Sequence, residues 1–110
     1  MAIENYEDTH YETRVVSSLP DAYRYTLREP IAVLINQVAK DCYEAVLFHE
    51  NEVYPSTRGL QGKTPDKAVD ELCSALIRDL ESLQKWPKLG HIPKKQLRYL
   101  KSILEEKLQF

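Results

Sequence analysis

IAVLINQVAKDCYEAVLF, residues 31–48, is the most apolar stretch of the sequence, and the expected fold depends on it. With helical spacing, seven apolar side chains fall on one face of this stretch: Ile31, Leu34, Ile35, Val38, Cys42, Ala45 and Val46. Val33, Leu47 and Phe48 lie elsewhere on the circumference. A helix that is apolar on more than one side needs neighbours packed around it. The stretch therefore predicts the central helix of a bundle.

Further segments also show helix signals. Thr64-Pro65-Asp66 is typical of a helix start with Thr64 as the N-cap, and apolar residues recur at helical spacing from there to residue 85. Residues 93–108 carry a narrower apolar seam, and Ser18-Leu19-Pro20-Asp21 predicts a short helix over about residues 19–28. We therefore expect an all-α fold: a small antiparallel helical bundle with three main helices, about 30–48, 65–85 and 93–108, plus the short one.

The length and composition are those of one globular domain. The chain has 110 residues, of which 43% are hydrophobic and 29% charged. Residues 1–13 carry four acids and no Lys or Arg, which predicts a flexible acidic arm before a single helical domain at 14–110. No apolar run reaches the roughly 18 residues that cross a bilayer, and the N-terminus lacks the order of a secretory signal. We expect a cytoplasmic protein with no membrane partner.

Motifs for catalysis or cofactor binding are weak. Gly62-Lys63-Thr64 resembles the end of a phosphate-binding loop, but the first glycine of that motif is replaced by Thr57, so we expect a loop and a capped helix start. Cys42 and Cys73 are interpreted as reduced core residues, with a disulfide between them as the alternative. No serine or cysteine has a base at motif spacing, and no set of His and Cys has metal-ligand spacing. The sequence predicts no catalytic residue, no metal, no cofactor and no small-molecule ligand.

Charge is divided unevenly along the chain. Residues 1–84 carry 15 acids and 8 Lys or Arg, whereas residues 85–110 carry 2 acids and 7 Lys or Arg. Residues 85–101 contain no acid, and clusters of this kind bind phosphate backbones or acidic proteins. The alternative is a solvated helix face whose charges balance acids elsewhere in the fold or in a second copy. The candidate residues for an anionic partner are Lys85, Lys88, His91, Lys94, Lys95, Arg98 and Lys101.

Two functions follow from these patterns. The first is a small non-enzymatic protein–protein interaction module, such as an adaptor, regulator or accessory subunit, which binds a protein partner or self-associates as a homo-oligomer. The second is a nucleic-acid-binding accessory protein that uses the basic segment at residues 85–101. A gel-shift series at low salt separates the two functions, because only the second predicts retardation of nucleic acid.

Overall fold

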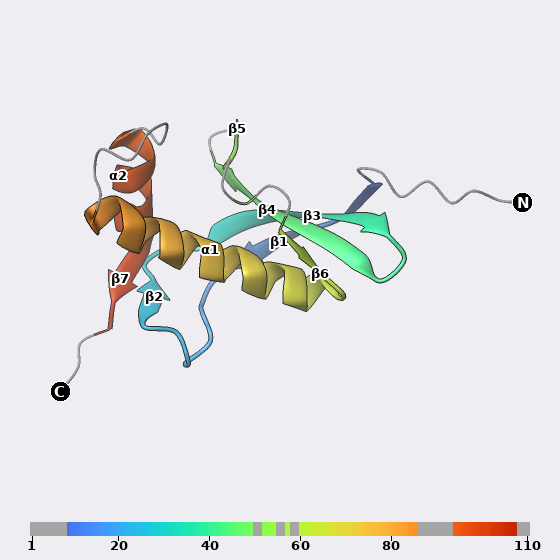
Figure 1. Ribbon diagram of the computed structural model, residues 1–110, viewed down its shortest axis with the longest axis horizontal. Coiled ribbons are helices and arrows are strands. Elements are labelled where there is room, and N and C mark those ends of the chain that lie inside the picture. Colours follow the sequence, from blue (N-terminus) through green and yellow to red (C-terminus); the bar gives the residue numbers. More distant parts are fainter. Residues whose placement is uncertain (1–8, 50–51, 55–56, 58–59, 86–93, 108–110) are drawn as a thin grey trace, which may run out of the picture.

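The computed structural model describes residues 9–49, 52–54, 57, 60–85 and 94–107, and it shows a mixed α/β protein (Figure 1). The predicted all-α bundle is wrong. A five-stranded antiparallel sheet has the order β1 (Thr9–Val16), β3 (Ile31–Ala39), β4 (Cys42–His49) and β5 (Glu52–Val53), with β6 (Gln61–Gly62) also paired to β4. A separate two-stranded sheet pairs β2 (Tyr25–Leu27) with β7 (Leu104–Glu106). Helix α1 (Pro65–Lys85) packs on the larger sheet, and α2 (Lys94–Ile103) lies at one end of the molecule beside β7 (Figure 1).

The stretch at 31–48 forms a β-hairpin and not the central helix. Strand β3 (Ile31–Ala39) pairs with β4 (Cys42–His49), and Lys40 and Asp41 form the turn between them. Asp41 has a φ of 57°, a left-handed conformation that aspartate tolerates better than most residues. Alternate residues point to one side of the hairpin and are fully or almost fully buried there: Ile31, Val33, Ile35, Ala45 and Leu47.

Helix α1 covers the side of the hairpin on which these buried residues lie. It spans Pro65–Lys85, so the bounds predicted from the sequence are confirmed. The side chain of Thr64 accepts a hydrogen bond from the backbone N–H of Lys67 at 3.1 Å, as expected of an N-cap. The buried face of the helix joins the buried strand residues in one core cluster through Ala68, Val69, Leu72, Cys73, Leu76, Leu80 and Leu83.

Strand β4 is extended on its second side by short segments of chain. It pairs with β5 (Glu52–Val53) at one end and with β6 (Gln61–Gly62) at the other. Between them, the backbone N–H of Leu47 donates to the hydroxyl of Thr57 at 3.1 Å, and the carbonyl of Leu47 accepts from the N–H of Tyr54 at 2.8 Å. Thr57 is fully buried, and its hydroxyl donates to the carbonyl of Tyr54 at 2.8 Å. Tyr54 and Thr57 thus satisfy the backbone groups of Leu47 at a position where neither β5 nor β6 pairs with β4.

Glycine is required where β6 meets α1. A Cβ atom at Gly62 would lie 2.4 Å from the backbone nitrogen of Ala68 and 2.7 Å from the carbonyl carbon of Lys67. Gly62-Lys63-Thr64 therefore brings a strand end against a capped helix start. The predicted capped start is confirmed, while Gln61 and Gly62 belong to a strand and not to the expected loop.

The remaining helix predictions are partly or wholly wrong. The helix predicted at 93–108 is shorter, because α2 ends at Ile103 and the chain continues directly as β7 (Leu104–Glu106). That strand pairs with β2 (Tyr25–Leu27), which lies within the short helix predicted at about 19–28, and none of those ten residues is helical. Arg24 forms an ion pair with Glu106, and the N–H of Arg28 donates to the carbonyl of Ile103 at 2.8 Å. Pairing between distant segments thus overrides the local helix signals.

The flexible acidic arm predicted at 1–13 is also wrong for its second part. Strand β1 (Thr9–Val16) pairs with β3 and forms one edge of the larger sheet, so residues 9–13 are in regular structure. Residues 1–8 lie outside the described residues. The pairing changes register between His10 and Glu12, which marks an irregularity at Tyr11, and regular pairing continues from Glu12 to Val16.

Candidate functional site

Edge strand β1 exposes apolar side chains. Across the part of the chain that the structure describes, two large hydrophobic residues are exposed: Tyr11, at 49%, and Val15, at 66%. Both belong to β1. Within the same residues, no strand pairs with the outer side of β1, so its outward backbone groups are available for pairing. An uncovered edge with exposed apolar side chains is a surface on which another strand can be added.

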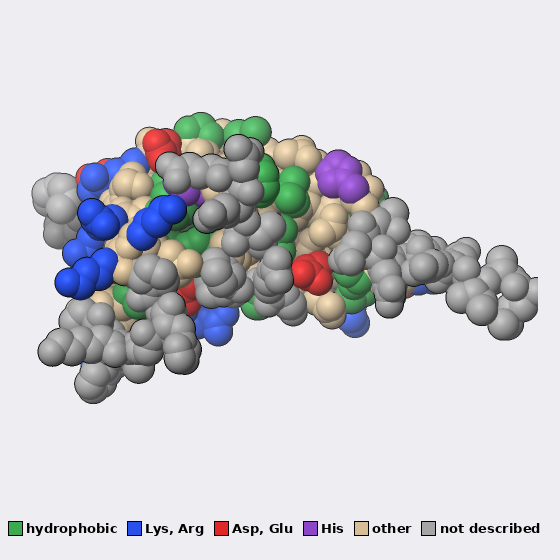
Figure 2. Space-filling model, turned by 90° about the horizontal axis from the view of Figure 1, so that it is seen from above, with side chains coloured by type: hydrophobic (Ala, Val, Ile, Leu, Met, Phe, Trp, Pro, Cys, Tyr) green, Lys and Arg blue, Asp and Glu red, His purple; other side chains and the backbone are tan. Residues whose placement is uncertain are grey.

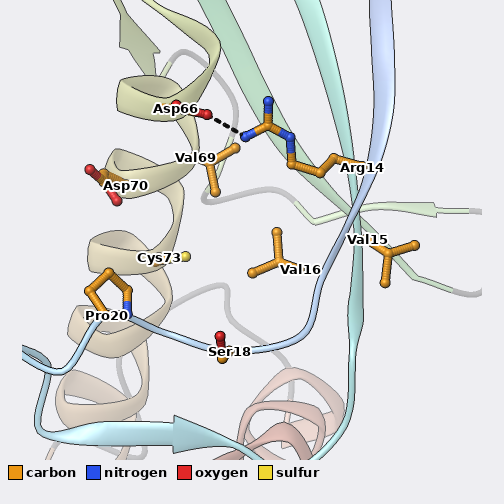
Figure 3. Close-up of a pocket in the computed structure, with 9 residues that line it drawn as sticks. All are labelled: Arg14, Val15, Val16, Ser18, Pro20, Asp66, Val69, Asp70 and Cys73. Atoms are coloured by element: carbon orange, nitrogen blue, oxygen red, sulfur yellow. Dashed lines mark hydrogen bonds and ion pairs between the residues drawn. The ribbon is translucent and has the colours of Figure 1, made fainter.

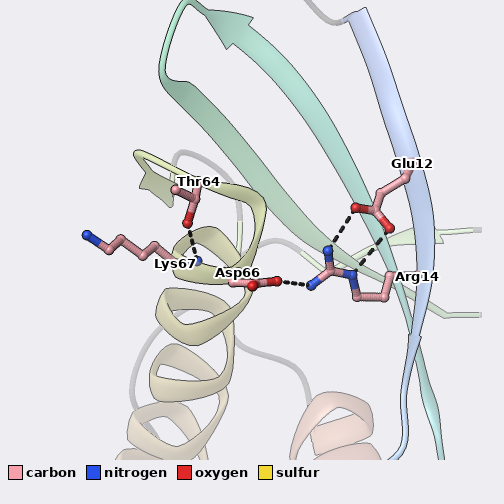
Figure 4. A network of polar contacts seen from close by, with 5 residues as sticks. All are labelled: Glu12, Arg14, Thr64, Asp66 and Lys67. Carbon is pink, nitrogen blue, oxygen red and sulfur yellow. Dashed lines mark hydrogen bonds and ion pairs between the residues drawn. The ribbon is translucent and has the colours of Figure 1, made fainter.

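Charged side chains on β1 face helix α1. Arg14 donates to both carboxylate oxygens of Glu12, at 2.8 and 3.3 Å, and to Asp66 on α1 at 2.8 Å (Figure 4). The side chains of Glu12 and Arg14 are 34% and 29% exposed. Hydrogen bonds to Glu12, and then to Asp66, raise the pKa of Arg14 above its usual value. These contacts fix the guanidinium between the edge strand and the first turn of the helix.

A groove of about 290 Å³ separates the end of β1 from α1. Figure 3 shows Arg14 and Asp66 joined across one end of this groove, with Val16, Val69 and Cys73 deeper along it. Ser18 and Pro20 line it where the chain leaves β1 and turns toward the helix. The groove is thus lined by apolar side chains with charged ones at its rim, a composition compatible with holding an apolar side chain.

The thiol in the groove is not activated for nucleophilic chemistry. Cys73 is 2% exposed, and burial, with a smaller contribution from the charge of Asp70, raises its pKa to about 11. A thiol with that pKa is protonated at neutral pH, and the thiolate is the reactive form. Cys42 is half-buried at the start of β4, with its sulfur 3.3 Å from the amide oxygen of Gln61. Both cysteines are free, so the alternative disulfide is not formed; Cys73 is a core residue as predicted, whereas Cys42 is half-buried and outside the core cluster.

The structure distributes the predicted basic residues over two helices. Lys85 ends α1, whereas Lys94, Lys95, Arg98 and Lys101 lie on α2. All five side chains are exposed. Figure 2 shows Lys and Arg side chains gathered at the end of the molecule where α2 lies. Lys88 and His91 lie outside the described residues, so their place in this group stays a prediction.

Two observations bear on whether α2 could bind an anionic partner. The side chains of Lys94, Arg98 and Lys101 form no ion pair or hydrogen bond with any described residue. The aromatic ring of Tyr99 stacks on His49 at the end of β4, with the ring centroids 3.8 Å apart. That ring is therefore engaged inside the protein, and Tyr99 does not supply a free surface for base stacking.

Two classes of site find no support in the described ranges. No group of three or more His, Cys, Asp or Glu is placed to hold a metal ion in residues 9–49, 52–54, 57, 60–85 and 94–107. Neither helix carries the long apolar window that would cross a bilayer.

Sequence reasoning missed the edge strand. The signal that could have found it is the weak alternation of polar and apolar residues at about 13–19, which overlaps the second half of β1. Comparison of the chain with protein-family models, with curated proteins and with solved structures returns no significant match.

Proposed function

We propose that the protein is a non-enzymatic interaction module that binds another polypeptide by adding an extended strand to β1. The observation that carries this proposal is the coincidence of three features on one strand. β1 is a sheet edge, it bears both large hydrophobic residues that are exposed in the described part of the chain, and it borders the groove against α1.

Strand addition uses each of these features. Backbone hydrogen bonds along an edge supply affinity for any extended chain, and pockets beside the edge select side chains. Soluble proteins protect such edges with lysine, proline or a covering element. The segment from Glu12 to Val16 contains neither lysine nor proline. Arg14 is drawn toward the helix by Asp66 and does not project past the edge as a lone charge. The segment from Glu12 to Val16 therefore lacks two of the usual protections, lysine and proline, although an irregularity precedes it at Tyr11 and its two charges are turned toward α1.

The test is selection of binding peptides from a displayed library of random ten-residue peptides. We expect enrichment of extended sequences with alternating apolar residues, and loss of their binding on Val15→Asp. The matched control is Ser82→Asp, which adds the same charge at an exposed position of α1. Hydrogen exchange should show new protection in β1 when a selected peptide binds. The proposal is wrong if the library yields no binder, or if the binders protect other strands and tolerate Val15→Asp.

The second candidate function is nucleic-acid binding by α2. The observation in its favour is that Lys94, Arg98 and Lys101 have no acidic partner among the described residues, so their charges are not neutralised there. Because Tyr99 is already stacked, we propose phosphate contacts without base recognition.

A gel-shift and salt-titration experiment tests this second candidate. Three phosphate contacts predict a slope of about −3 for log K against log salt on duplex DNA. Replacing Lys94, Arg98 and Lys101 together with alanine should abolish binding. The matched control replaces Lys40, Lys63 and Lys67, which are also exposed and carry the same total charge. Retardation that both triple variants retain, or no retardation at low salt, excludes this candidate.

The cytosol is the compartment that we propose for either function. Both cysteines are free, including the half-buried Cys42, and thiols persist in a reducing environment.

A further inference from the structure

We infer that the strand added to β1 is β1 of a second copy of this chain, paired antiparallel about a two-fold axis at Thr13. This inference rests on the proposed function and names its partner. A two-fold axis through the edge makes one continuous sheet from two copies and removes both free edges at once.

The charged residues of β1 indicate where the two-fold axis lies. An axis at Glu12 would place two glutamates opposite each other, and an axis at Arg14 would place two arginines opposite each other. An axis at Thr13 places Glu12 of each copy opposite Arg14 of the other. Like charges directly opposite on paired strands are unfavourable, whereas opposite charges and threonine pairs are favourable. The sequence Glu12-Thr13-Arg14 is therefore complementary to itself in one register.

The side chains lie where this register needs them. Glu12 and Arg14 are two residues apart on one strand, and both join the network that reaches Asp66, so they share the face that is turned toward α1 (Figure 4). Residues directly opposite on antiparallel strands project to the same face. Glu12 and Arg14 also lie in the regular part of β1, beyond the irregularity at Tyr11. The central pairs of the dimer thus avoid the distorted end of the strand.

Arg14 keeps capacity for a further carboxylate. Its hydrogen bonds to Glu12 and Asp66 use three N–H donors, and a guanidinium group carries five. Each oxygen of Glu12 accepts one bond from Arg14 and has a second lone pair available. Both residues can bind their counterparts in the second copy while keeping the contacts shown in Figure 4.

The experiment exchanges the charges one at a time and measures mass in solution by sedimentation velocity. The wild-type chain should sediment as a dimer of twice 12.8 kDa. Glu12→Arg alone creates opposed arginines, and Arg14→Glu alone creates opposed glutamates, so each variant should raise the dimer Kd by about tenfold or more. An equimolar mixture of the two variants restores both opposite-charge pairs and should form a heterodimer with a Kd within about threefold of wild type.

Covalent trapping checks the register without changing these charges. Thr13→Cys in a Cys42→Ser background brings two thiols together at the axis and should give a disulfide-linked dimer on mild oxidation, whereas Ser82→Cys in the same background should not. The folded state of each variant is checked by circular dichroism. Recovery in the mixture also shows that the single variants are folded.

A wild-type chain that is monomeric at about 100 µM overturns this inference. So does a dimer in which neither charge variant changes the Kd. If such a monomer still captures displayed peptides at β1, the proposed function stands and only the identity of the partner is wrong. If the chain is monomeric and also captures no peptide at β1, both the proposed function and this inference are wrong.

Discussion

Replacing Thr57 with valine tests whether one buried hydroxyl completes the edge of β4. The side chains of threonine and valine have nearly the same shape, so the change removes hydrogen bonding without opening a cavity. The hydroxyl accepts from the N–H of Leu47 at 3.1 Å and donates to the carbonyl of Tyr54 at 2.8 Å. The carbonyl of Tyr54 keeps a second partner, the N–H of Thr57 at 3.2 Å. The N–H of Leu47 loses its bond to the hydroxyl.

The expected cost follows from that loss. Leaving a buried N–H unsatisfied costs about 1–3 kcal/mol. We expect Thr57→Val to lower the free energy of unfolding by about 2 kcal/mol, and a chain of this size loses about 4 °C in Tm per kcal/mol. The expected fall in Tm is therefore about 8 °C. Thr57→Ser keeps the hydroxyl and loses one methyl group, so it should cost about 1 kcal/mol.

Urea denaturation measures both free energies, and hydrogen exchange measures protection at the amide of Leu47. We expect that amide to exchange faster in Thr57→Val but not in Thr57→Ser. If the valine variant is as stable as wild type, or if the two variants cost the same and Leu47 keeps its protection, the hydroxyl does not hold the loop on β4.

Three further outcomes follow from the structure. Because burial raises the pKa of Cys73 from 9.0 to about 11, the native state holds a proton that the unfolded chain loses. The free energy of unfolding should therefore fall as the pH rises between those two values, by up to about 1.4 kcal/mol per pH unit. Urea titration across that pH range should show a steeper fall in wild type than in Cys73→Ala. Gly62→Ala forces a methyl group against the backbone of Ala68 and should cost about 1–3 kcal/mol, and a Tm equal to wild type would contradict this close approach. Thr64→Ala removes the cap on the N–H of Lys67 and should cost about 1 kcal/mol, whereas Thr64→Ser should retain most of it in thermal melts.

Local signals were sufficient where they agreed with the long-range packing. Helix α1 has a cap at Thr64, proline at its first position and an apolar stripe on one side, and its bounds were predicted from those features. The β-hairpin has no equivalent signal. Ala32 and Leu34 are apolar on the face opposite Val33, so strict alternation is hidden. The apolar residues of β3 and β4 then also fit a helical spacing. The turn at Lys40 and Asp41 contains no glycine to reveal it.

The candidate site could be predicted less well than α1. A strand is an edge strand because no other strand pairs with one of its sides. That property depends on the topology of the whole sheet and not on the local sequence. Glu12 was interpreted as part of a solvated acidic arm, yet it is half-buried and bound to Arg14. Asp66 was expected near the positive end of a helix, where it lies, but its contact with Arg14 spans 52 positions of sequence. The basic residues of α2 were visible as a cluster because they are neighbours along the chain.

The pairing of β2 with β7 has a consequence for how the chain condenses. Arg24 and Glu106 are 82 positions apart, and the entropy lost on closing a loop grows with its length. Only three residue pairs join the two strands to offset that loss of entropy, and the exposed ion pairs beside them contribute little to stability. The small sheet therefore depends on the burial of Tyr25 and Leu104 in the core cluster more than on its own backbone pairs. Because these two side chains belong to the same cluster as the hairpin and α1, the contact between residues 82 positions apart is coupled to formation of the main core.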